Sequence, residues 1–78
     1  MKVFQVKGLT GVLEGSKGYG DFESQEIYIE EDLDTIEEKR LLVIHEVLDM
    51  WLHGRIKHSK IDRISLGIIE GLQQIGVF

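Results

Sequence analysis

The fold is decided by the stretch TIEEKRLLVIHEVLDMWLH (residues 35–53), in which apolar residues recur with the period of an amphipathic helix. The stretch begins with a capping box, in which the Thr35 hydroxyl accepts a hydrogen bond from the Glu38 amide. Gly54 follows it and favours the left-handed residue that ends many helices. We therefore expect a helix that runs to about His53. The residues expected to form its buried stripe are Leu41, Ile44, Leu48, Trp51 and Leu52.

A second helix is expected after a short polar turn. The sequence SKID (residues 59–62) offers a similar N-terminal cap, with Ser59 as the capping residue. In this interpretation capping alone accounts for Asp62, and Gly76 ends the helix. The residues expected to form its buried stripe are Ile61, Ile64, Ile68, Leu72 and Ile75.

The segment before the first helix predicts a small sheet. Strands are expected at residues 3–6, 12–13 and 26–30, the last because EIYIE alternates β-branched and aromatic residues with charged ones. The glycine-rich residues 15–20 are expected to form a flexible loop. This order predicts an α+β domain in which a small antiparallel sheet of about three strands is followed by two packed helices.

Length and composition limit what the chain can be. A chain of 78 residues with 42% hydrophobic and 29% charged residues is expected to form one globular domain spanning residues 1–78. It contains no cysteine, so disulfides and thiolate metal sites are excluded. The sequence has no apolar run long enough to span a membrane and no signal-peptide pattern, so we expect a cytoplasmic protein without a membrane partner.

The formal charge of −5 is unevenly distributed. Residues 14–49 hold twelve acidic residues against three basic ones, whereas the basic residues of the C-terminal part gather between Arg55 and Arg63. A nucleic-acid site requires a longer basic stripe with interleaved aromatic residues, so we do not expect nucleic-acid binding. The same net charge argues against a DNA-binding protein of the helix-turn-helix class.

Candidate metal ligands lie along one strip of the first helix. His45, Asp49 and His53 are spaced four residues apart, which places them on neighbouring turns. Imidazoles and carboxylates are the donors that zinc accepts when thiolates are absent. Glu46 stands next to His45, as the general base does in the motif His-Glu-x-x-His. An alternative is that His45 is a partly buried histidine bonded to Glu38 or Asp49.

With the strand at residues 25–29, the acidic linker at 30–34 and the second helix, the chain resembles the very small zincin-type metallopeptidase domains often encoded by phages and prophages, of the ImmA/IrrE type. The likeness covers residues from about 20 to 75. It implies that His45 binds zinc and that Glu46 is the general base. The second ligand position of the family falls on Asp49, and the third falls on or near Asp62, with Glu70 as the alternative.

Aspartate at position 49, where the family has histidine, leaves two outcomes open. Either a rearranged set binds the metal, namely His45 and Asp49 with one of His53, His58 or Asp62, or no metal is bound and the scaffold serves for binding. The first outcome predicts a minimal zinc-dependent peptidase. The second predicts a non-catalytic phage or prophage product that binds a host protein or peptide through its acidic surface, in an inhibitory or anti-defence role. A second copy of the chain is a further expected partner.

Overall fold

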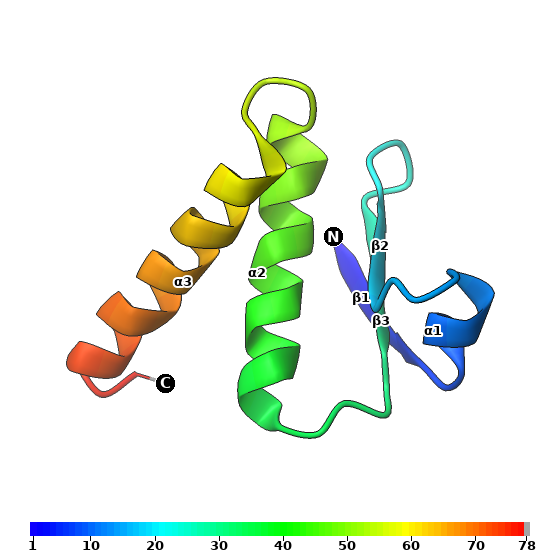
Figure 1. The fold of residues 1–78 in the computed structure, drawn as a ribbon, viewed down its shortest axis with the longest axis horizontal. Helices are drawn as coiled ribbons and strands as arrows, with labels where there is room; N and C mark the ends of the chain where they lie inside the picture. The colour runs from blue at the N-terminus through cyan, green and yellow to red at the C-terminus, as the bar shows by residue number, and fades with distance from the viewer. Residues whose placement is uncertain (78) are drawn as a thin grey trace.

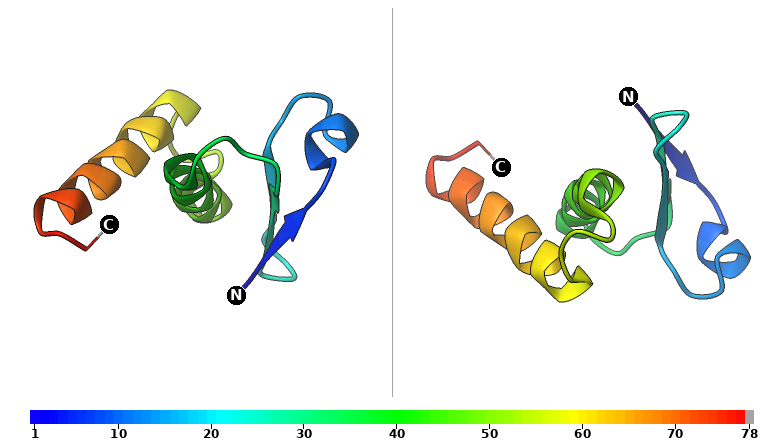
Figure 2. Two further views of the ribbon diagram at one scale, coloured as in Figure 1. Left: turned by 90° about the horizontal axis from the view of Figure 1, so that it is seen from below. Right: turned by 90° about the horizontal axis from the view of Figure 1, so that it is seen from above.

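The computed structural model describes residues 1–77, which form a three-stranded sheet followed by two packed helices. Helix α2 lies between the sheet on one side and α3 on the other (Figures 1 and 2). The predicted α+β class is therefore confirmed. The elements in chain order are β1 (Lys2–Val6), α1 (Leu9–Val12), β2 (Gly18–Asp21), β3 (Glu26–Glu30), α2 (Ile36–Leu52) and α3 (His58–Gln74).

The sheet is mixed, whereas an antiparallel one was predicted. Its strand order is β1-β3-β2, with β1 parallel to β3 and β2 antiparallel to β3. Two parallel neighbours require a long crossover connection, and here α1 and β2 together form it. Strand β3 therefore occupies the centre of the sheet, and both other strands are edges.

Two local predictions in the crossover are wrong. The expected strand at residues 12–13 is replaced by α1, and the expected loop at 15–20 contains the start of β2. Helix α1 depends on a residue far away in sequence, since the Glu30 side chain on β3 accepts a hydrogen bond from the Thr10 amide. The glycines of β2 allow the strand to lie close to α2, and they do not make the segment a loop.

Helix α2 begins as predicted. Thr35 is its N-cap, and the Thr35 hydroxyl accepts a hydrogen bond from the Glu38 amide at 3.2 Å. Gly54 has φ of +78°, the left-handed value expected after the helix. Trp51 departs from the prediction, because it is 51% exposed and packs edge-on against Phe22 with ring centroids 5.1 Å apart.

Helix α3 begins one residue before the predicted cap. Its N-cap is Lys57, which makes no side-chain capping bond, so the predicted cap by Ser59 is wrong and the Asp62 carboxylate takes another partner. The helix diverges from α2 toward its C-terminal end (Figure 1), which leaves Ile75 73% exposed. Its buried face is therefore rotated from the predicted stripe and consists of Ile61, Ser65 and Ile69.

The apolar core consists of few residues. Ile27 and Ile29 of β3 lie on the face of the sheet that meets α2, and Ile61 and Ile69 pack from α3 on the other side of that helix. Leu9 of α1 is buried as well. On the outer face of the sheet, rings from all three strands lie in a row formed by Phe4, Tyr28 and Tyr19. None of the helices within residues 1–77 has the length and apolar character needed to cross a membrane.

Glu30 connects the sheet to α1. Its side chain is only 5% exposed, and its two carboxylate oxygens accept hydrogen bonds from the backbone amides of Thr10 at 2.9 Å and Asp32 at 3.2 Å. Both bonds are stronger to the charged form of the carboxylate and therefore favour it. They lower the pKa of Glu30 from its ordinary 4.5 to about 2. The charge of Glu30 therefore stabilises the fold.

This interaction predicts a pH-dependent contribution to stability. Because the pKa of Glu30 is lower in the folded state, its contribution is present above about pH 4.5 and is lost as the pH falls toward 2. We expect Glu30→Gln to lower the free energy of unfolding at neutral pH, and the difference from wild type to shrink between pH 4.5 and 2. Urea unfolding over a pH series measures it. Glu31→Gln, at the exposed next residue, is the control, and a difference that does not change with pH would contradict the assignment.

Candidate metal centre

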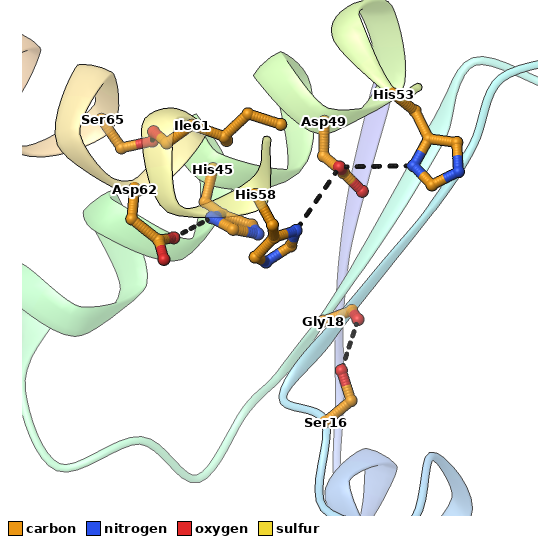
Figure 3. Close-up of polar contacts among 9 residues, drawn as sticks. All are labelled: Ser16, Gly18, His45, Asp49, His53, His58, Ile61, Asp62 and Ser65. Carbon is orange, nitrogen blue, oxygen red and sulfur yellow. Dashed lines mark hydrogen bonds and ion pairs between the residues drawn. The ribbon is translucent and has the colours of Figure 1, made fainter. Parts of the chain in front are cut away.

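The residues predicted to form one strip on α2 separate into two groups. The Nδ1 atom of His45 lies 2.8 Å from Oδ1 of Asp62, which reaches it from α3 (Figure 3). Asp49 instead lies near His53 and His58, with its Oδ1 3.6 Å and 3.8 Å from their Nδ1 atoms. The expected bond between His45 and Glu38 or Asp49 is thus replaced by one to Asp62.

His58 completes a cluster of potential metal ligands. One ligand atom from each of His45, His58 and Asp62 lies within 4.8 Å of the other two. The two imidazole rings are adjacent, with centroids 4.5 Å apart and planes inclined at 63° (Figure 3). Two imidazole nitrogens and one carboxylate oxygen are a donor set that fits zinc. These three residues therefore form the candidate metal centre.

Two predicted ligands lie outside this cluster. The side chain of His53 is 84% exposed. Within residues 1–77, the one carboxylate that it contacts is that of Asp49. Asp49 borders the candidate metal centre through His58 and is not one of its three donors. Glu70, the alternative third ligand, lies on an exposed part of α3 and is also absent from the cluster.

A repeated spacing explains how the cluster is assembled. The sequence contains His-x-x-x-Asp twice, at residues 45–49 on α2 and at residues 58–62 on α3. The turn between Leu52 and His58 sends α3 back along α2 in roughly the opposite direction (Figure 1). Each histidine therefore faces the aspartate of the other helix, at 2.8 Å for one pair and 3.8 Å for the other. This repeat is the signal in the sequence that would have pointed to His58.

Glu46 is only 9% exposed, and no other residue of α2 is buried in the part of the chain that the structure describes. No hydrogen bond or ion pair of its carboxylate is found within residues 1–77. Burial raises the pKa of Glu46 above its ordinary value, and Asp49 acts in the same direction, whereas His45 and His58 act to lower it. No side-chain oxygen within residues 1–77 is both shielded from solvent and without a partner, so the Glu46 carboxylate oxygens reach solvent and are available to a ligand.

The glycines of β2 make room for this carboxylate. A Cβ atom at Gly18 would lie 3.1 Å from Oε1 of Glu46 and equally close to Cδ1 of Leu42. A Cβ atom at Gly20 would lie 3.6 Å from Oε2 of Glu46 and 3.3 Å from Cε of Met50. Glycine at both positions therefore allows β2 to approach α2 where Glu46 is buried.

Two cavities meet at Glu46. One has a volume of about 340 Å³ and extends over apolar residues that include Leu41 and Leu66. The other has a volume of about 510 Å³ and extends along β2 toward Tyr19 and His53. The residues that line both cavities are Ser16, Gly18, His45 and Glu46. A ligand in either cavity would thus reach His45 and Glu46, whereas Asp62 lines only the first cavity and His58 only the second.

A methyl group added at Gly18 tests this packing. We expect Gly18→Ala to lower the free energy of unfolding by about 1–3 kcal/mol, because the packed side chains of Glu46 and Leu42 must move to admit the methyl group. Gly67→Ala is the matched control: a Cβ atom there meets no atom within 4 Å, and alanine favours the helix, so stability should rise by about 0.5–1 kcal/mol. Urea unfolding measures both. Equal effects of the two substitutions would show that Gly18 is not closely packed.

Comparison with known proteins adds no relative. No protein-family model, curated protein or solved structure matches the chain.

Proposed function

We propose that this protein is a zinc-dependent hydrolase that holds the ion through His45, His58 and Asp62. The observation that carries this proposal is the meeting of their three ligand atoms within 4.8 Å of one another. Catalytic zinc sites use three nitrogen or oxygen donors from the protein and leave a further position for water or substrate. The donors here match that number and type, and the cavities beside them give access to the remaining position.

Asp62 prepares the site before an ion arrives. Its carboxylate lies 2.8 Å from Nδ1 of His45 and therefore fixes the orientation of the ring. His58 is more exposed than His45. An ion would therefore reach the candidate metal centre from the side on which His58 lies.

Glu46 is the proposed general base. A bound zinc ion supplies Lewis acidity, which lowers the pKa of water and polarises a carbonyl oxygen. Glu46 follows His45 in sequence, lines both cavities and has no competing hydrogen bond within residues 1–77. Its carboxylate is thus free to accept a proton from water and to deliver it to a leaving group. A peptide as substrate follows from the resemblance to zincin-type metallopeptidases.

A second candidate function is supported by the same short contact. The Asp62 carboxylate satisfies His45 without an ion, and aspartate stands at position 49, where the resembled family has histidine. A scaffold that binds no metal would then act through its surface. The net charge of −9 over residues 14–49 favours a basic protein partner, including a host protein if the gene is of phage or prophage origin.

Zinc binding provides the first test. Protein purified without chelator is expected to contain about one equivalent of zinc, and zinc at 100 times its Kd should stabilise the fold by about 2.7 kcal/mol. His45→Ala and His58→Ala should each abolish the thermal shift, whereas His53→Ala, which alters an exposed histidine outside the cluster, should retain it. Elemental analysis and thermal unfolding measure both quantities. Absence of zinc together with absence of a shift would exclude the hydrolase and favour the binding function.

Removing the proposed base gives the second test. Glu46→Gln is expected to retain zinc and to lower peptide hydrolysis by about 10²–10⁴-fold, because the substitution removes only proton transfer. Glu37→Gln makes the same change at an exposed position of α2 and should leave the rate unchanged. A quenched fluorescent peptide library measures cleavage. Hydrolysis that survives Glu46→Gln would remove Glu46 from the proposed role without affecting the metal assignment.

A further inference from the structure

The turn that joins α2 to α3 carries a concentration of positive charge unlike any other part of the chain. Four of the nine lysine and arginine residues fall between positions 55 and 63. All four line one cavity of about 450 Å³, together with the half-buried Ile56 and the hydroxyl-bearing Ser59. The cationic residues of this basic pocket are Arg55, Lys57, Lys60 and Arg63.

These cations have no acidic partner within residues 1–77. The ion pairs found in this part of the chain all join a histidine to an aspartate. Asp62, the single acidic residue between positions 55 and 63, is occupied by His45 at 2.8 Å. The chain has five more acidic than basic residues, so the absence of pairing does not come from a shortage of carboxylates. Four like charges around one cavity repel each other, and an anion in the cavity would remove that repulsion.

The start of α3 adds to the positive potential of the basic pocket. This 17-residue helix begins at His58, its N-cap Lys57 makes no side-chain hydrogen bond, and its first turn contains no acidic residue. The amide groups at a helix N-terminus carry partial positive charge. That partial charge lies at the point where the four cationic side chains gather.

We propose that the basic pocket binds a phosphate group carried by a small, multiply charged ligand. Arginine offers planar pairs of N–H donors that match phosphate oxygens, lysine adds point charges, and the Ser59 hydroxyl is a further donor. The cavity volume falls within the range of about 300–1,000 Å³ found for small-molecule sites.

The charge distribution favours a compact ligand over a nucleic acid. A phosphodiester chain is longer than the basic pocket, and the protein that it would lie against has a net charge of −5, with −9 over residues 14–49. Charges more than about 10 Å apart are largely screened at ordinary ionic strength, so a small ligand would experience the local positive charge with little of that repulsion.

The basic pocket and the candidate metal centre lie on different flanks of α3. At 100° per residue, Ser59, Lys60 and Arg63 leave α3 on one side of the helix. Their mean direction lies about 130° around the helix axis from the mean direction of His58 and Asp62. Phosphate binding is therefore separable from the proposed hydrolysis, and metal-free protein is suitable for testing it.

Inorganic pyrophosphate is the probe for the test, added to the ¹⁵N-labelled, metal-free protein of 78 residues. We expect saturable changes in amide chemical shifts confined to residues 55–63. The double variant Arg55→Gln/Arg63→Gln should weaken binding tenfold or more, because each guanidinium supplies paired donors. The control is Lys2→Gln/Lys7→Gln, which changes the net charge by the same amount at exposed positions on and just after β1. It should bind as wild type does, and the amide spectrum of each variant confirms that it is folded.

Further arms distinguish the sources of the phosphate. Vesicles containing a phosphoinositide, compared with pure phosphatidylcholine vesicles, report a lipid headgroup; binding to the former alone would identify that source, and binding to neither would favour a soluble ligand. Single-stranded DNA that binds at lower concentration than pyrophosphate would overturn the preference for a compact ligand. Shifts that do not saturate at millimolar pyrophosphate, or that are equal in the arginine and lysine variants, would overturn the proposed site.

Discussion

The packing of the Glu46 side chain between α2 and β2 is the constraint on which the rest of the structure depends. The residue is only 9% exposed, yet no side-chain oxygen within residues 1–77 is both shielded from solvent and without a partner, so the Glu46 carboxylate loses part of its hydration while its oxygens keep some contact with water. The glycines of β2 leave the space that it occupies, and the few buried isoleucines on either side of α2 must provide stability to offset its cost.

The parts of the fold that were correctly predicted depend on neighbours in sequence. The α2 cap at Thr35 and the left-handed Gly54 are set by local hydrogen bonding and backbone sterics. The errors arise where distant residues decide. Helix α1 depends on Glu30, the glycines of β2 are explained only by α2, and the buried face of α3 follows from its angle to α2. The parallel pairing of β1 with β3 likewise has no signal in either strand alone.

The candidate site was anticipated in part for the same reason. His45 and Glu46 were singled out by a pattern within one helix, and Asp62 by resemblance alone. His58 entered only as one of several alternatives, since its position depends on the length of the turn and on the direction of α3. The residues that open α3 therefore have two chemical roles in our proposals. One flank contributes donors to the candidate metal centre, and the other surrounds the basic pocket.

Helix α3 packs mainly against α2 and diverges from it, so the two helices are held together chiefly near the turn that joins them. The three candidate ligands bridge that same junction, with His45 on one helix and His58 and Asp62 on the other. An ion at this position would cross-link the helices as a disulfide does in small secreted proteins, in a chain that contains no cysteine. Loss of the ion would then first increase the freedom of α3 while the sheet and α2 stay folded.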